Sequence, residues 1–206
     1  MDAAPSAVNR RGRLTPARER ELLQAALDLV AEVGYERFTM AELAKRTQSS
    51  TATLYRQWES KPKMVITALK IRNEEQGATL DFDTGSLRGD LLRLVAGVFG
   101  EPSSSKPMMS IWHAVGSDKE LTRLLREILV VPGLRTLHRI LQRGVERGEV
   151  TNIAAVELAD RVLFGPLMIQ ELISDEEPSR ALTESVIDHV LLPALTAPVG
   201  AADASS

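Results

Sequence analysis

The chain has 206 residues, 44% of them hydrophobic, and a formal net charge of −3. This composition is typical of soluble globular proteins, and no apolar run approaches the roughly 20 residues that span a bilayer. Cysteine is absent, which excludes disulfides, thiolate metal sites and a cysteine nucleophile and fits a cytoplasmic location.

Charge is distributed unevenly along the chain. Residues 1–63 carry 11 Lys/Arg and 8 Asp/Glu, a balance of +3, whereas residues 64–206 carry 14 and 20, a balance of −6. A basic end on an acidic body predicts that only the N-terminal end meets a polyanion. Ordinary scatter of charges is the alternative explanation of the same numbers.

Helical periodicity dominates between two polar ends. We expect residues 1–15 to form a flexible basic arm and residues 198–206 to form a disordered tail, because both are rich in small and polar residues. The arm is too polar for a secretory signal. The sequence between the ends has neither alternating β-branched runs nor the Asn-Gly and Asp-Gly turns of hairpins. We therefore predict an all-α fold.

The first predicted helix starts at Pro16, since proline is favoured in the first turn of a helix. Its apolar residues recur at intervals of three and four: Leu22, Ala26, Leu29 and Val33. Gly34 follows the last of them, where a left-handed residue can end a helix.

A second, short helix is predicted at residues 40–47. Thr39 precedes it as an N-cap, and Glu42 stands three residues later, as in a capping box. The N-cap and the capping box together predict where this short helix begins.

A third helix is predicted at residues 50–58, after a polar turn at residues 48–50. Leu54 and Trp58 lie one helical turn apart and are expected to face inward. Two short helices joined by about three polar residues indicate a helix-turn-helix, whose second helix enters the major groove of DNA.

The outward face of the third helix carries small or hydrogen-bonding side chains: Ser50, Thr51, Ala52, Thr53, Tyr55, Arg56 and Gln57. Threonine and alanine can contact a thymine methyl group, arginine can pair with guanine and glutamine can pair with adenine. This face is therefore the candidate surface for reading bases.

A fourth helix follows Ser60 and has Lys61 in its first turn, with Lys63 nearby. A cation there opposes the helix macrodipole, which makes sense if an anion binds at the same place. A DNA phosphate is the obvious anion, and the Tyr55 hydroxyl can reach the same backbone. The alternative is a solvated lysine and a half-buried tyrosine.

The motif residues resemble a known family. Thr39-Met40-Ala41-Glu42-Leu43-Ala44, Thr53-Leu54-Tyr55-Arg56-Gln57-Trp58 and Ser60-Lys61 are similar to the DNA-binding domain of the tetracycline-repressor (TetR) family. The close match covers roughly residues 16–70. A weaker similarity, at residues 83–90, is to the start of the C-terminal domain in a subset of that family.

The resemblance implies an all-helical homodimer with a DNA-binding head and a divergent body. On that pattern Thr39 and Tyr55 contact phosphates, Lys61 anchors the backbone, and residues 51–53 read bases. The expected domains are a head at residues 16–62 and an effector-binding and dimerisation domain at residues 63–197. One departure is Gln48-Ser49, where the family usually has glycine followed by an apolar residue, which predicts a less tightly packed turn.

The basic arm has two interpretations. Its arginines at positions 10, 11 and 13 can lie along the minor groove or the phosphates, as flexible basic arms often do. They can equally make up a solubilising tail.

Further helices are predicted in the body at residues 86–99, 107–115, 119–131, 134–147, 154–173 and 179–195. Pro102, Pro132, Gly148 and Pro178 separate them. Pro166 falls inside one of these helices and predicts a kink there.

Catalytic patterns are missing from the sequence. The three histidines are far apart, and no His-Glu-x-x-His, Gly-x-Ser-x-Gly or Walker motif occurs. We expect no metal, no cofactor and no enzymatic activity, and a small helical enzyme is the remote alternative.

Large soft side chains of the body predict an apolar ligand pocket: Phe99, Met108, Met109, Trp112, Phe164 and Met168, with His113 and Gln170 as polar contacts. Methionine and aromatic residues suit adaptable binding of apolar ligands. Residues at helical spacing are also what an ordinary core requires, so both interpretations remain.

The last two long helices are candidates for a dimer interface, through Leu158, Val162, Ile169 and Leu172 on one and Leu182, Val186, Val190 and Leu191 on the other. A four-helix seam between two copies would bury such faces. Burial inside one subunit is the alternative.

Together these patterns predict a homodimeric repressor of transcription. It binds a near-palindromic double-stranded DNA site and leaves it when an apolar small molecule binds; no membrane is involved. The alternatives are a DNA-binding regulator without a small-molecule effector, and an activator.

Overall fold

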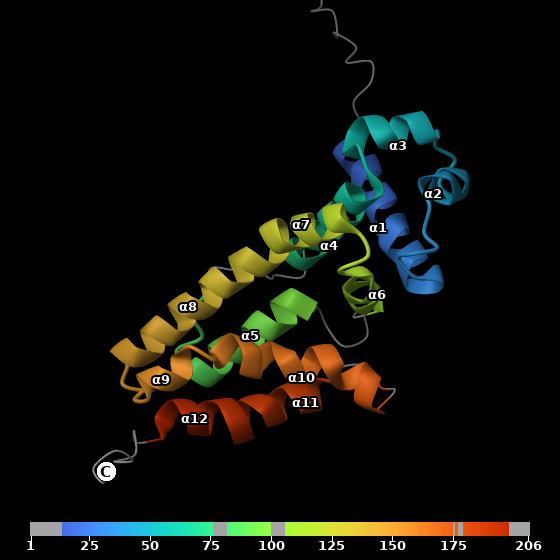
Figure 1. Cartoon of the computed structure of the whole chain (residues 1–206). Helices are drawn as coiled ribbons and strands as arrows, with labels where there is room; N and C mark the ends of the chain where they lie inside the picture. Colours follow the sequence, from blue (N-terminus) through green and yellow to red (C-terminus); the bar gives the residue numbers. More distant parts are fainter. Residues whose placement is uncertain (1–13, 76–81, 100–105, 175, 177–178, 198–206) are drawn as a thin grey trace, which may run out of the picture.

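The computed structural model describes residues 14–75, 82–99, 106–174, 176 and 179–197. Every regular element in these ranges is a helix, which confirms the predicted all-α fold (Figure 1). The arginines at positions 10, 11 and 13 and the tail from residue 198 lie outside the described residues. In the described ranges no helix has both the length and the apolar character needed to cross a membrane.

The head begins with three helices that lie together at one end of the elongated molecule, and a fourth leads into the body (Figure 1). They are α1 (Pro16–Val33), α2 (Met40–Arg46), α3 (Thr51–Trp58) and α4 (Lys61–Glu75). The Thr39 hydroxyl accepts from the Glu42 N–H at 3.1 Å, as the cap predicts. The Ser50 hydroxyl accepts in the same way from the Thr53 N–H at 3.1 Å.

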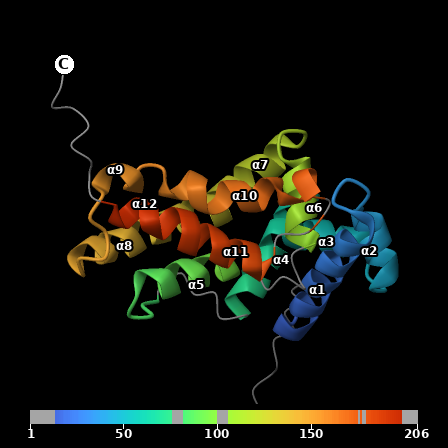
Figure 2. The ribbon, with the colours of Figure 1, turned by 90° about the horizontal axis from the view of Figure 1, so that it is seen from below.

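The body contains the remaining elements: α5 (Leu87–Phe99), α6 (Lys106–Ala114), α7 (Lys119–Leu125), η2 (Arg126–Val130), α8 (Val131–Glu146), α9 (Ile153–Val156), α10 (Ala159–Ser174), α11 (Arg180–Val186), η3 (Ile187–Leu191) and α12 (Leu192–Thr196). The views show α10 beside α11 and α9 beside α12, with α5 and α8 packed against each other (Figures 1 and 2). The elements η2 and η3 are π turns that join their flanking helices without a break.

The prediction that Pro132 separates two helices is wrong. The chain stays helical from α7 through η2 into α8, and Pro132 is the second residue of α8. Proline in an ordinary helix clashes with the carbonyl four residues earlier and cannot donate to it. Here that carbonyl belongs to Ile128 in the wider π turn, which accommodates the ring. Pro193, two residues after η3, has the same arrangement.

The single helix predicted at residues 154–173 is also wrong, because α9 ends before Leu158 and α10 begins after it. The segment that leads into α9 is bound to α12. The Thr151 and Asn152 N–H groups both donate to the Leu195 carbonyl, at 3.0 and 2.9 Å. These bonds hold α9 against α12, so tertiary contacts override the local preference for an unbroken helix.

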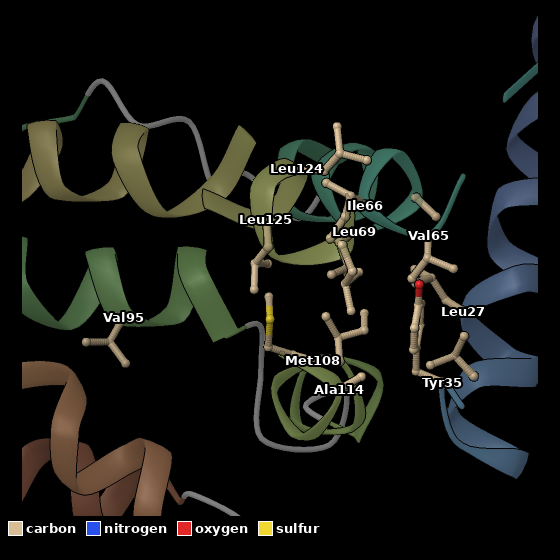
Figure 3. Close-up of a cluster of buried hydrophobic side chains, with 14 of the residues drawn as sticks. Leu27, Tyr35, Val65, Ile66, Leu69, Val95, Met108, Ala114, Leu124 and Leu125 are labelled. Carbon is tan, nitrogen blue, oxygen red and sulfur yellow. The ribbon is translucent and has the colours of Figure 1, made fainter. Parts of the chain in front are cut away.

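One hydrophobic cluster runs from the head into the body. Figure 3 shows where the two meet: Leu69 of α4 lies among Leu125 of α7 and Met108 of α6, and Leu27 and Tyr35 of the head lie beside them. Helix α4 packs on α1 on one side and on α7 on the other. The head is thus joined to the body through a continuous core rather than through a loose linker.

A buried carboxylate fixes the end of the body farthest from the head. Asp90, in the first turn of α5, has no exposed surface. Its carboxylate accepts from the Thr84 N–H at 2.7 Å and from the guanidinium groups of Arg143 and Arg147 at 3.0 and 3.3 Å. Burial opposes its ionisation, but these donors outweigh burial and hold the pKa of Asp90 below its ordinary value.

We expect Asp90→Asn to lower the free energy of unfolding by about 3 kcal/mol at neutral pH, because two partly buried guanidinium groups lose their counter-charge. Urea denaturation measures the loss. Since the folded pKa is depressed, the contribution of Asp90 is present above about pH 5 and disappears as the pH falls below about 4. The difference in the free energy of unfolding between wild type and Asp90→Asn must therefore become smaller in acid.

The matched control is Asp83→Asn. Asp83 pairs with the same arginines, but its side chain is 51% exposed, so solvent screens its charge and the expected loss is much smaller than for Asp90→Asn. Equal losses of unfolding free energy in the two variants would contradict the conclusion that Asp90 is the carboxylate that fixes this end of the body.

Candidate nucleic-acid interface

Helix α3 presents a polar face because its apolar residues are turned inward. Leu54 is fully buried and Trp58 is 3% exposed, so both pack into the head. Tyr55 is 49% exposed although it is a large aromatic residue. This exposure leaves the hydroxyl and the ring open to a partner.

Four of the predicted base-reading or phosphate-binding residues on α3 are exposed together: Thr51, Ala52, Tyr55 and Arg56. Thr39, the N-cap of α2, and Ser50, the N-cap of α3, are also exposed. The Thr53 hydroxyl is half-buried and shares a 2.8 Å hydrogen bond with the Ser50 hydroxyl. The geometry therefore concentrates the candidate surface at the N-terminal part of α3.

Gln57 lies differently from what its position in the sequence suggests. It is half-buried, and its side-chain amide donates to the Glu19 carboxylate of α1 at 3.4 Å. The residue thus ties the end of α3 to α1 instead of facing outward. Helical spacing alone carries no information on this contact between distant parts of the chain.

The turn between α2 and α3 is closed by hydrogen bonds. Gln48 has a φ of 52°, in the left-handed region that favours glycine. The buried Thr47 hydroxyl donates to the Leu43 carbonyl at 2.7 Å, and the Ser49 N–H donates to the Ala44 carbonyl at 2.8 Å. Hydrogen bonds thus close this turn at Gln48-Ser49, where the family usually has glycine followed by an apolar residue.

Lys61 lies in the first turn of α4, as predicted, and its stem is half-buried against the loop between α1 and α2. Its ammonium is 4.2 Å from the centre of the Tyr35 ring and 5.8 Å from that of Phe38, and it donates to the Glu36 carbonyl at 3.3 Å. Burial lowers the pKa of Lys61, while Asp118 and Glu36 oppose that shift. The contacts with the two rings and the Glu36 carbonyl therefore hold the Lys61 ammonium in place near the C-terminal end of α3.

A cavity of about 240 Å³ lies in the body, between α5, α6, the end of α7, η2, α8 and α10. Met108, Trp112, Phe164 and Met168 line it, together with further apolar residues, and Asp160 and Arg161 reach its edge. The cavity therefore offers an apolar ligand an almost entirely hydrophobic wall.

Other predicted pocket residues do not line this cavity. Met109 is buried elsewhere, His113 is exposed, and the Gln170 amide donates to the Ser174 hydroxyl at 2.7 Å. The side chain of Phe99 lies outside the described residues. Within the described ranges no group of three or more His, Asp or Glu side chains is placed to hold a metal ion.

The predicted dimer residues are divided between the surface and the interior. Leu158, Ile169 and Val190 are 56%, 48% and 51% exposed. Val162 is half-buried, and Val186 is only 6% exposed. Val186, and Leu191 at 1% exposed, therefore pack inside the subunit, and this part of the predicted seam is corrected.

A capped helix-turn-helix with an exposed N-terminal recognition face on an all-helical body defines a DNA-binding regulator. Two family models match the chain: "Bacterial regulatory proteins, tetR family" at residues 22–68 and "Tetracyclin repressor-like, C-terminal domain" at residues 82–190. The chain belongs to the tetR family of transcriptional regulators.

Curated relatives agree with this assignment. An uncharacterized HTH-type transcriptional regulator of Mycobacterium tuberculosis is 33% identical over 186 residues, covering 89% of this chain and 90% of the relative. A DNA-binding transcriptional repressor, TetR, of Mycobacteroides abscessus is 30% identical over 173 residues, covering 77% and 90%.

Solved structures share the fold. The regulator FadR from Bacillus subtilis, in complex with stearoyl-CoA, has a TM-score of 0.66 at 21% identity and covers 84% of this chain and 97% of its own. A putative regulator from Saccharomonospora viridis, in complex with choline, has a TM-score of 0.65 at 22% identity and covers 85% and 96%.

We expect Lys61→Gln to weaken binding to all duplexes alike, because a phosphate contact carries no sequence information. The dependence of affinity on salt should fall by about one unit of slope. Filter binding or fluorescence anisotropy over a series of salt concentrations measures both quantities.

Lys70→Gln is the matched control, since Lys70 is exposed on the same helix and pairs only weakly, at 3.7 Å, with Glu74. This variant removes the same charge at a position away from α3 and should leave the salt dependence of duplex affinity unchanged. An unchanged slope for Lys61→Gln would argue against a phosphate contact.

Proposed function

We propose that this protein is a homodimeric repressor that reads a near-palindromic duplex with α3 and leaves it when an apolar small molecule enters the body. The observation that carries the proposal is that the helices which line the cavity also hold the head. The following contacts support each part of it.

The DNA-reading part rests on the exposed face of α3. Thr51 and Ala52 are small enough for close approach to base edges, and Arg56 supplies the donor that pairs with guanine. Thr39, Tyr55 and Lys61 are our candidates for phosphate contacts on either side of that face. Two copies related by a two-fold axis would place their α3 helices about 34–36 Å apart, in successive major grooves.

The effector part rests on the cavity. Its walls are apolar, and the methionine side chains among them can adapt to ligands of different shape. The structures of relatives in complex with stearoyl-CoA and choline support a ligand site in a body of this fold. The wall of this chain favours an uncharged or long-chain apolar compound, because the Asp160–Arg161 pair, at 3.1 Å, already neutralises the charges at its edge.

The coupling between cavity and head rests on α6 and α7. The Ser110 hydroxyl of α6 accepts from the Tyr35 N–H at 2.7 Å, and α6 also places Met108 and Trp112 in the cavity wall. The Asp118 carboxylate, which caps α7, accepts from the Tyr35 hydroxyl at 2.9 Å. A ligand that displaces these helices therefore alters contacts to the loop that holds Lys61.

A second contact acts at the start of α4. The Ser60 hydroxyl donates to the Glu120 carboxylate of α7 at 2.8 Å, next to the lysine proposed to bind a phosphate. Since a ligand acts only through its different affinity for two states, the DNA-bound and ligand-bound states must differ at such contacts. Ligand and duplex then weaken each other's binding by the same factor.

The dimer part rests on exposed apolar residues of the last helices. Leu158, Ile169 and Val190 are large, hydrophobic and about half exposed, and Ile173 near the end of α10 is 72% exposed. Exposed apolar surface of this kind is typical of an interface between copies. We propose that this face, without the buried Val186 and Leu191, joins the two subunits.

We expect the purified protein to select near-palindromic duplexes from a random pool. Fatty acids or polycyclic aromatic compounds should raise its melting temperature and weaken binding to the selected duplex by roughly 5–150-fold. Thermal shift and anisotropy measurements test both effects. Selection of duplexes with a single half-site would contradict the dimer, and a panel without any stabilising compound would contradict the effector.

Gly133→Leu provides the variant that isolates the cavity in this experiment. Gly133 lines the cavity, and a Cβ built on it would be 3.6 Å from Val98, an ordinary contact. The added side chain should fill the space and abolish the ligand effect without loss of duplex affinity. Ala96→Leu, at an exposed position of α5, adds bulk outside the cavity and should preserve both the ligand effect and the duplex affinity.

We expect Tyr35→Phe to reduce the ligand-induced loss of duplex affinity by about five-fold, because the hydrogen bond from Tyr35 to the Asp118 cap of α7 is removed. The ring remains under Lys61, so binding to the duplex without ligand should persist. Tyr55→Phe removes a candidate phosphate contact outside the link, so it should lower duplex affinity and leave the fold-change caused by the ligand intact. Equal ligand effects in wild type and Tyr35→Phe would refute this route of coupling.

A further inference from the structure

The first turn of α1 makes polar contacts that neither core packing nor DNA contact explains. Arg18 is 30% exposed at its side chain, yet it reaches residues about 30 positions further along the chain. Its guanidinium donates to the Thr47 carbonyl and, at 3.0 Å, to the Ser49 hydroxyl, and it also pairs with Glu21. Both distant partners belong to the turn that connects α2 to α3.

This turn has a particular need for an external donor. Gln48, between the two partners, has a φ of 52° without being a glycine, so its backbone is in a region that side chains other than glycine adopt at a cost. Ser49 offers no apolar side chain to pack beneath α3. A planar guanidinium with several donors in fixed directions can bind a carbonyl and a hydroxyl at once.

The neighbouring residue of α1 holds the other end of the recognition helix. The Glu19 carboxylate accepts from the Gln57 side-chain amide at 3.4 Å, in the last turn of α3. Consecutive residues of α1 thus contact the turn before α3 and the end of α3. Helix α3 has only eight residues, so two fixed ends define its orientation.

We propose that Arg18 is a positioning residue for the recognition helix, which sets sequence selectivity through the turn at Thr47 and Ser49 and not by touching DNA. The proposal rests on the proposed role of α3 as the reader of bases. A recognition helix that tilts loses contacts to base edges, while contacts between charged residues and the phosphates tolerate the change.

The test compares Arg18→Gln with Arg20→Gln. Arg20 lies on the same helix, is exposed, and pairs with Glu75 at 3.0 Å, so the second variant removes the same charge without touching the turn. The probes are the duplex that the wild-type protein selects from a random pool and a scrambled duplex of equal length. Affinities for both are measured over a range of salt concentrations, together with melting temperatures.

Arg18→Gln should weaken binding to the selected duplex about ten-fold, the loss expected when one base contact is spoiled. Its affinity for the scrambled duplex should equal that of Arg20→Gln. Equal loss on both duplexes, or a salt slope lower by about one unit in Arg18→Gln alone, would overturn the proposal, because Arg18 would then be a phosphate contact.

Ser49→Ala keeps Arg18 and removes one of its acceptors, so it tests the same link if Arg18→Gln folds poorly. It should also lower the affinity for the selected duplex relative to the scrambled one. In the Arg18→Gln background it should cause no further loss of selectivity, since both changes break the same interaction. Additive losses would overturn the proposal. If the wild-type protein selected no duplex at all, the proposed function would fail, which is a different result from equal behaviour of Arg18→Gln and Arg20→Gln.

Discussion

The organisation of the molecule depends on the burial of Tyr35 where the head meets the body. The residue is 3% exposed, and Figure 3 shows its ring beside Leu27 and Val65. Burial, and then its hydrogen bond to Asp118, raise the pKa of the Tyr35 hydroxyl, so it stays a neutral donor. Because the Lys61 ammonium lies over the same ring, one aromatic side chain connects the core, the cap of α7 and a candidate DNA contact.

Local sequence rules were sufficient to place the helix boundaries of the head. The hydroxyl of Thr39 caps α2 as its position before Met40 predicts, and α1 begins at Pro16 and ends before Gly34. Each of these features depends on residues within four positions of one another, so periodicity and capping chemistry contain all that is needed. The same holds for the inward side of α3, which Leu54 and Trp58 define.

Features that depend on distant parts of the chain could not be predicted in this way. The contact of Gln57 with Glu19, the burial of Val186 and the absence of Met109 from the cavity all follow from which helix packs where. Pro132 continues a helix instead of ending one for a related reason, because a π turn is not visible in hydrophobic spacing. Sequence patterns identify an apolar face, but only packing decides whether a partner, a ligand or the same chain covers it.

The distribution of polar contacts suggests where a response to ligand can occur. At the far end of the body Asp90 is buried among charged donors, so that end resists rearrangement. At the junction, beside the apolar contacts of the shared core, the polar links are single hydrogen bonds from Tyr35 and Ser60 to side chains of α6, of α7 and of the cap of α7. Each such bond contributes only about 1 kcal/mol net, whereas separating the apolar faces of α1 and α4 would expose the core. A ligand in the cavity is therefore expected to change the junction and leave both the far end and the head intact as units.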